Sequence, residues 1–262
     1  MPQGLKIIYY VEPDADALTQ RTARHFVEVA ETAVAARGRA RIAISGGSAP
    51  KPVFEALADP SLPWRARMPW QNLEIFWVDE RCVPPDDKAS NYRMAREAML
   101  DRVPLDPAQI HRMEGELEPE AAAACYESEL RNCFRLEGAE SPRFDLIQLG
   151  LGTNGHTASL FPHSAALHEF GRLAVANLTD AEQPWRLTLT APVINQGAQV
   201  FFLVSKGDKA EVLRDVLLGP RDPERLPSQL IRPVSGILTL LLDKAAAELL
   251  PPTDADGRGE LL

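Results

Sequence analysis

The chain has 262 residues, of which 45% are hydrophobic and 25% charged, and its net charge is −9. This composition is typical of a globular protein, and the acidic balance argues against nucleic acid or an anionic membrane as a partner. Every apolar run is shorter than the roughly 18 residues that a membrane helix needs. The first residues do not resemble a secretory signal, and three unpatterned cysteines do not suggest a disulfide framework. We therefore expect a cytoplasmic protein.

Short apolar runs alternate with helical patterns along the chain, which predicts an α/β fold with a parallel sheet. The expected strands are residues 5–11, 41–45, 73–78, 144–149, 172–176, 186–190, 199–205 and 237–242. The expected helices are residues 16–37, one that includes 53–57, then 90–100, 118–136, 208–218 and a last helix capped by Asp243. We expect a single domain over residues 1–250, followed by a flexible tail at residues 251–262.

Three of the predicted strands end in residues that are unusual for plain connections. These segments are Ser45–Ser48, Asp79–Arg81 and Gly150–His156. Because the carboxyl ends of parallel strands meet at one edge of a sheet, where ligands bind, we expect the three segments to line one site.

The first segment reads SGGS and lies between a strand and a helix. Gly46 and Gly47 allow backbone N–H groups to turn toward an anion, and the helix dipole and the hydroxyl of Ser48 would help to bind a phosphate. The pattern is neither a Walker loop nor a dinucleotide fingerprint. A tight turn that needs glycine for its backbone conformation is the structural alternative.

The third segment belongs to the loop GLGTNGHTASLFP, in which glycines surround His156. An imidazole in such a loop can approach a substrate closely and act as a general base near neutral pH. The alternative is that His156 caps the following helix. His163 and His168 have no partner at metal-ligand spacing, so no metal site is expected.

The remaining charged candidates follow two other predicted strands. Asp79 and Glu80 could share acid and base work, and Arg81 could bind a phosphate, although a salt-bridged strand end explains them as well. Lys206 and Lys209 follow the strand near residue 204, where an ammonium could contribute positive charge to a phosphate-binding site. Together these features suggest an enzyme acting on a small phosphorylated molecule. Because no GxSxG motif and no activated cysteine is visible, we expect water as the nucleophile.

Four segments together resemble one known family over residues 7–250, nearly the whole chain. They are SGGSAPKPVFEAL, WVDERCVPPDDKASNYRMAREAML, FDLIQLGLGTNGHTASLFP and RLTLTAPVINQGAQVFFLVSKGDKAEVL. The resemblance is to the 6-phosphogluconolactonases, which share a family with the glucosamine-6-phosphate deaminases. It implies a modified Rossmann-like α/β fold with helices on both faces of a mostly parallel sheet. It also implies hydrolysis of 6-phosphoglucono-1,5-lactone to 6-phosphogluconate in the pentose phosphate pathway, without metal or cofactor, by a monomer or small homo-oligomer.

The resemblance also implies roles for individual residues. His156 corresponds to the general base, with Asn154 and Asp79 beside it in the catalytic group. The residues implied in substrate binding are Gly46, Gly47, Ser48, Glu80, Arg81, Gly155, Arg186 and Lys209. In the implied mechanism the phosphate is bound by the Gly46–Ser48 loop, and His156 activates water for attack on the lactone carbonyl.

One position departs from the family pattern. The family usually has Asp before Gly-His, and this chain has Asn154. An asparagine can hydrogen-bond to the imidazole, but it supplies no charge to raise the pKa of His156.

Two other functions remain open. An amino-sugar-phosphate isomerase or deaminase shares the fold, but the deaminases carry Glu five residues after the loop histidine, where this chain has Phe161. A non-catalytic sugar-phosphate sensor would bind the same ligands without turnover, and Asn154 is compatible with such a protein.

Overall fold

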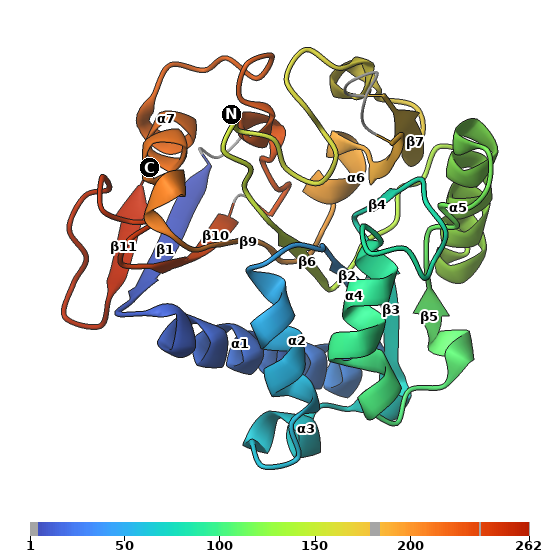
Figure 1. Cartoon of the computed structure of the whole chain (residues 1–262), viewed down its shortest axis with the longest axis horizontal. Coiled ribbons are helices and arrows are strands. Elements are labelled where there is room, and N and C mark those ends of the chain that lie inside the picture. The colour runs from blue at the N-terminus through green and yellow to red at the C-terminus, as the bar shows by residue number, and fades with distance from the viewer. Residues whose placement is uncertain (1–4, 179–183, 236, 262) are drawn as a thin grey trace.

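An eight-stranded sheet runs through the centre of the protein, as the computed structural model shows for residues 5–178, 184–235 and 237–261 (Figure 1). Its strand order is β11-β1-β10-β9-β6-β2-β3-β5, and all neighbouring strands are parallel except β11 and β1. The strands are β1 (Lys6–Glu12), β2 (Ala40–Ile44), β3 (Leu73–Trp77), β5 (Ile110–His111), β6 (Leu146–Leu149), β9 (Val200–Val204), β10 (Ile237–Asp243) and β11 (Arg258–Leu261). The predicted parallel α/β sheet is confirmed.

Helices cover both faces of this sheet, with α1, α2 and α3 on one side and α6 and α7 on the other (Figure 1). The α-helices are α1 (Ala15–Arg37), α2 (Pro50–Ala58), α3 (Pro63–Arg67), α4 (Asn91–Ala98), α5 (Pro119–Phe134), α6 (Ala191–Asn195) and α7 (Ala210–Leu218). Short 3-10 helices are η1 (Trp70–Asn72), η2 (Leu100–Arg102), η3 (Pro107–Gln109), η4 (Ala165–His168), η5 (Gly207–Lys209) and η6 (Pro227–Leu230). None of the helices in the described ranges combines the length and the apolar character needed to cross a bilayer.

The first helix shows how closely local signals set the element boundaries. Asp14 caps α1, because its carboxylate accepts a hydrogen bond from the backbone N–H of Ala17 at 2.8 Å. Gly38 ends the helix with φ 76°, a conformation that glycine adopts without strain. Between them, Leu18 and Phe26 face the core. The predicted helix at residues 16–37 is therefore confirmed almost to the residue.

A second, antiparallel sheet of three strands lies beside the central one. Its order is β4 (Asp79–Arg81), β8 (Arg186–Leu189), β7 (Ala174–Asn177). The chain passes from β3 into β4 through Val78, whose N–H donates to Ile44 O at 2.9 Å in the central sheet and whose carbonyl accepts from Leu189 in the small one. The residues after the third predicted strand are therefore part of a sheet and not of a loop.

Two predictions for the C-terminal part are wrong. No helix follows Asp243: residues 244–249 form turns, in which the Asp243 carboxylate accepts the N–H of Ala246 at 2.8 Å. The short run before Pro251 leaves too few residues for a stable helix. The segment after Pro251 packs against the central sheet, because β11 pairs with β1 and Gly259 lies against the ring of Tyr9.

Candidate active site

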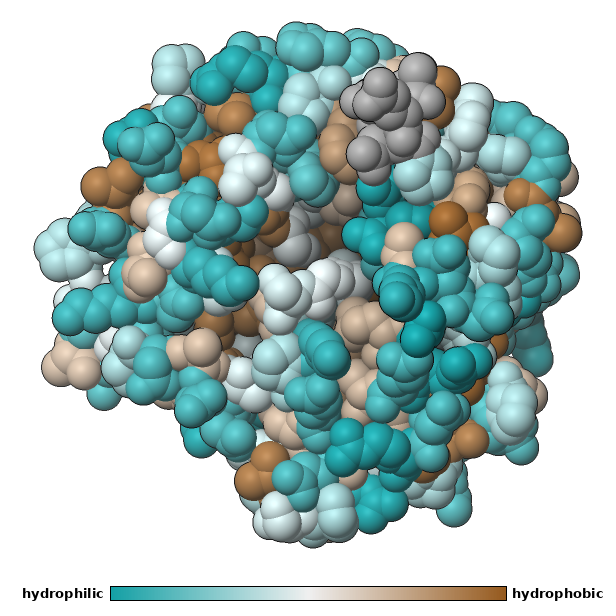
Figure 2. Space-filling model, in the orientation of Figure 1, coloured by the Kyte–Doolittle hydropathy of each residue, from teal (hydrophilic) through white to brown (hydrophobic). Residues whose placement is uncertain are grey.

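A cavity of about 270 Å³ opens where β2, β3, β6 and β9 end. A hollow is visible in the middle of the molecular face that Figure 2 shows. Its lining includes residues from all three strand-end segments that the sequence singled out. The predicted site residues that line it are Gly46, Gly47, Ser48, Asp79, Arg81, His156 and Lys209. Segments far apart in the sequence therefore meet at one edge of the sheet, as the parallel topology requires.

The SGGS loop connects β2 to the start of α2. Gly47 has φ 111°, and a Cβ on Gly46 would lie 1.8 Å from Oδ1 of Asn91, so both positions need glycine. Gln148 fixes the loop from β6, because it accepts the N–H of Ser45 at 3.0 Å and donates to the Ser45 hydroxyl at 2.7 Å. No side chain in the described ranges caps the N-terminus of α2, and its first residue, Pro50, has no N–H, so the N–H groups that can meet an anion in the cavity are those of the preceding loop.

His156 is held in one tautomer by Asn154. The backbone N–H of His156 donates to Oδ1 of Asn154 at 3.3 Å, which identifies that atom as the acceptor oxygen. The same oxygen lies 2.6 Å from Nδ1 of the imidazole, so Nδ1 carries the proton and Nε2 keeps its lone pair. Phe161 stacks on the ring at a centroid distance of 4.2 Å, and Gly152 leaves room for it on another side.

Burial, together with the positive charges of Arg186, Lys209 and Arg81, lowers the pKa of His156 to about 4. The imidazole is therefore neutral at pH 7, which is the state that can accept a proton.

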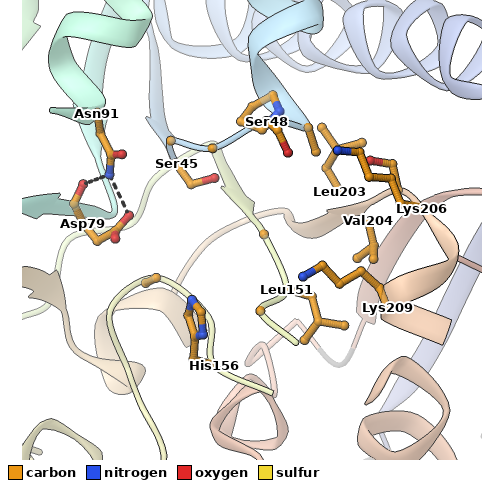
Figure 3. Close-up of a pocket in the computed structure, with 18 of the residues that line it drawn as sticks. Ser45, Ser48, Asp79, Asn91, Leu151, His156, Leu203, Val204, Lys206 and Lys209 are labelled. Atoms are coloured by element: carbon orange, nitrogen blue, oxygen red, sulfur yellow. Dashed lines mark hydrogen bonds between the residues drawn. The ribbon is translucent and has the colours of Figure 1, made fainter. Parts of the chain in front are cut away.

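The two adjacent acidic residues point to different surroundings. Asp79 lines the cavity, and its carboxylate accepts from the hydroxyl of Ser159 at 2.8 Å and from the amide of Asn91 at 3.3 Å (Figure 3). Burial raises the pKa of Asp79. Glu80 does not line the cavity. Its carboxylate accepts from the hydroxyl of Ser90 and from three backbone N–H groups, at Arg81, Asn91 and Tyr92, and so holds the start of α4.

The cationic side chains come from three elements. Arg81 on β4 lies directly opposite Arg186 on β8, and burial together with the charge of Arg81 lowers the pKa of Arg186. Arg186 is not among the lining residues, but its guanidinium lies over the ring of Phe161 at 5.9 Å. Lys206 and Lys209 extend into the cavity on the side opposite Asp79 (Figure 3). The site is therefore electropositive although the protein carries a net charge of −9.

Gly155 and Asn154 lie behind the imidazole and are not among the lining residues. Gly155 has φ 81°, and its carbonyl accepts hydrogen bonds from the N–H of Ser228 at 2.9 Å and its hydroxyl at 2.8 Å. A Cβ at Gly155 would lie 2.6 Å from Leu226. Both residues therefore hold the loop that presents His156.

Comparisons with known proteins place the chain in a family. Residues 13–240 match the family described as glucosamine-6-phosphate isomerases/6-phosphogluconolactonase. The chain belongs to this family. A 6-phosphogluconolactonase of Synechocystis sp. is 46% identical over 221 residues, which are 84% of this chain and 88% of that protein. A structure titled as the 6-phosphogluconolactonase from Trypanosoma cruzi is 30% identical, with a TM-score of 0.80, over 95% of this chain and 98% of that one.

The deaminase branch of the glucosamine-6-phosphate isomerase/6-phosphogluconolactonase family has the same fold. The structure of a monomeric glucosamine-6-phosphate deaminase superposes with a TM-score of 0.75 over 92% of this chain and 99% of that one. At 20% identity this likeness shows the fold alone. The predicted deaminase-like α/β fold is confirmed.

Several residues that shape the cavity were not predicted from the sequence. Asn91 lines the cavity and donates to Asp79, while Gln148 and Ser159 hold the loop and the carboxylate from behind. The available signal was the capping pattern at Ser90, which places Asn91 at the first position of α4 beside the end of β3.

Within the described ranges, one group of His, Cys and acidic side chains is close enough to consider as a metal site: His111, Glu129 and Cys133. It lies on β5 and α5 and shares no residue with the cavity lining. The His111 Nδ1 to Glu129 Oε1 distance is 2.6 Å. Two ligands of one tetrahedral zinc ion would be about 3.3 Å apart, given its bond lengths. A hydrogen bond therefore explains this contact.

Proposed function

We propose that this chain hydrolyses 6-phosphoglucono-1,5-lactone to 6-phosphogluconate, with His156 as the general base. The observation that carries this proposal is the imidazole itself. Asn154 fixes its proton on Nδ1, which leaves Nε2 unprotonated in a cavity that also holds an anion-binding loop and several cations. The names of the relatives support the choice of substrate.

Binding begins with the phosphate. Its oxygens accept from the N–H groups of the Gly46–Ser48 loop at the start of α2, and the charges of Lys209 and Arg81 offset its two negative charges. This contact is remote from the lactone carbonyl, so its binding energy orients the reacting end of the substrate.

Hydrolysis then follows from the neutral imidazole. Nε2 of His156 accepts a proton from water as the water oxygen attacks C1 of the lactone. Arg186 does not line the cavity, but its positive charge lowers the pKa of His156, and the same charge favours the oxyanion. The imidazolium returns its proton to the ring oxygen as the C1–O bond breaks, which gives the open-chain acid.

Substrate binding also makes the base stronger. Lys209 and Arg81 are among the charges that lower the pKa of His156, and the phosphate neutralises part of their field. The pKa therefore rises when substrate is bound, and the imidazole accepts a proton more readily at the stage where one must be transferred.

The direct test is hydrolysis of 6-phosphogluconolactone, prepared in situ and corrected for spontaneous ring opening. We expect a protein-dependent rate far above the background, and no release of ammonia from glucosamine 6-phosphate. Phe161 places a phenyl ring against the imidazole, where the deaminases carry a carboxylate. Rapid ammonia release would favour the deaminase, whereas tight binding of 6-phosphogluconate without any turnover would favour a sensor.

The pH dependence follows from the pKa of His156. Because the base must be unprotonated, we expect kcat/KM to rise through about pH 4 and to be level near neutrality. The acid limb of kcat should lie at a higher pH, because bound phosphate raises the pKa. Rate measurements from pH 3.5 to 8, with unfolding monitored at each pH, check both limbs.

The variant Asn154→Asp sharpens the same test. A carboxylate at the present 2.6 Å from Nδ1 favours the imidazolium, so the acid limb of kcat/KM should move up by about 1–3 pH units. A limb that Asn154→Asp leaves in place would contradict the assignment of His156 as base, whereas a wild-type limb near pH 6.5 would contradict only the lowered pKa.

A further inference from the structure

Lys206 has a backbone conformation that few residues other than glycine adopt. It follows β9 with φ 78° and ψ 145°. Arg135, another residue with positive φ, has φ 55° and ψ 47°, the ordinary left-handed conformation at the end of a helix. The conformation of Lys206 lies next to a region that is nearly exclusive to glycine, and it is strained for a side chain with a Cβ.

The surrounding structure holds Lys206 in this conformation. A buried carboxylate, Asp243 at the end of β10, accepts the N–H of Lys206 at 2.9 Å, and the same side chain accepts the N–H of Ala246. The next residue is Gly207, and η5 begins there. A glycine at position 206 would make the same backbone hydrogen bond without strain, because that bond uses no atom of the side chain.

The side chain of Lys206 lines the cavity together with Lys209 and the Gly46–Ser48 loop (Figure 3). The nearby carboxylate of Asp208 pairs with the other lysine, since its Oδ2 lies 3.8 Å from Nζ of Lys209. In the described part of the chain, none of the ion pairs includes Lys206. The ammonium of Lys206, an exposed residue at the rim of the cavity, adds positive charge to a site that already contains Lys209 and Arg81, and an anion bound there offsets the repulsion between them.

We propose that Lys206 is a second lysine for the phosphate of the substrate, and that the backbone strain at this position is retained because it places the ammonium in the cavity. This inference rests on the proposed function in taking the ligand to be a phosphate monoester. With Lys209, it gives the cavity two ammonium groups for a dianion. Lys206 thereby increases the preference for phosphorylated over unphosphorylated lactones.

The test compares three substitutions. Lys206→Gly removes both charge and strain, Lys206→Ala removes the charge and keeps the strain, and Lys206→Arg keeps both. We expect Lys206→Gly to raise Tm by about 2–4 °C and to raise KM for 6-phosphogluconolactone roughly tenfold. Lys206→Ala should raise KM similarly without the gain in Tm, and Lys206→Arg should stay near the wild type in both.

Two controls make the result specific. Unphosphorylated gluconolactone should be hydrolysed at unchanged kcat/KM by all three variants. The second control is Lys51→Ala, which removes an exposed lysine of α2 whose Nζ lies 3.9 Å from Oε1 of Glu55. This variant should alter neither KM nor Tm by a comparable amount. Lys206→Gly with a raised Tm and an unchanged KM would overturn the proposal, because the strain would then have no counterpart in binding. A Lys206→Gly variant with no gain in Tm would overturn the role given to strain.

Failure of the proposed function can be told apart from failure of this inference. Calorimetric binding of 6-phosphogluconate, with gluconate as the unphosphorylated control, needs no turnover. If the wild type does not hydrolyse the lactone but Lys206→Gly binds 6-phosphogluconate about tenfold more weakly, the lactonase proposal fails and the role of Lys206 stands. If the variant binds 6-phosphogluconate as tightly as the wild type does, the role of Lys206 fails whatever the reaction is.

Discussion

Replacing His156 by alanine is expected to lower kcat for 6-phosphogluconolactone by about 10²–10⁴-fold, with KM changed by less than about threefold. The substitution removes Nε2, the atom proposed to accept the proton from water. It leaves the Gly46–Ser48 loop and Lys209 in place, and these are proposed to bind the phosphate. Steady-state kinetics corrected for spontaneous opening, together with calorimetric binding of 6-phosphogluconate, separates the two effects.

A matched control is His168→Ala. The side chain of His168 is 66% exposed, and its Nε2 lies 3.2 Å from Oε1 of Glu224. This histidine is not among the residues that line the cavity. Its removal should leave kcat unchanged. A His156→Ala variant with full turnover would show that another group activates the water. Loss of turnover together with loss of 6-phosphogluconate binding would point to a damaged cavity and not to a missing base.

The location of the site could be predicted because it depends on topology. Buried apolar strands such as residues 73–78 predict a parallel sheet, and a parallel sheet brings its strand ends together. Gly46, Asp79 and His156 accordingly line one cavity although they are far apart in the sequence.

The directions of Asp79, Glu80 and Arg81 are harder to predict, because the sequence places these residues between the end of a strand and the start of a loop. They form β4, and successive side chains of a strand point to opposite faces. Asp79 and Arg81 therefore line the cavity, while Glu80 faces the start of α4. A strand of three charged residues carries no apolar pattern. Its partner β8 lies about a hundred positions later in the chain, so the sequence gives no local signal for it.

The C-terminal part shows the same limit. The alanines after Asp243 favour a helix by propensity, but Pro251 follows too soon for one to form. Strand β11 is short and polar, and it exists because the edge of β1 is available to it. The strained backbone of Lys206 is likewise fixed by a distant partner, Asp243 on β10. Each of these features depends on contacts between segments that only the folded chain brings together.

Gly152→Ala is expected to lower kcat/KM by about 10²-fold without removing any chemical group from the site. A Cβ at this position would lie 2.0 Å from Nδ1 and 2.1 Å from Cε1 of His156, far below an ordinary contact distance. The imidazole must therefore move by more than about 1 Å, and a displacement of that size costs a rate of this order. The movement also breaks the hydrogen bond to Asn154 that fixes the tautomer.

The matched control for this substitution is Gly171→Ala, since a Cβ there would meet only the side chain of Glu169 at 3.5 Å. Kinetics for both variants should be compared with their thermal unfolding and with calorimetric binding of 6-phosphogluconate, which Gly152→Ala should retain. Such a result would show that the position of the imidazole, and not only its presence, sets the rate. If Gly152→Ala kept full kcat/KM, the geometry around His156 would have no bearing on the reaction, and its assignment as the base would fail even if His156→Ala were inactive.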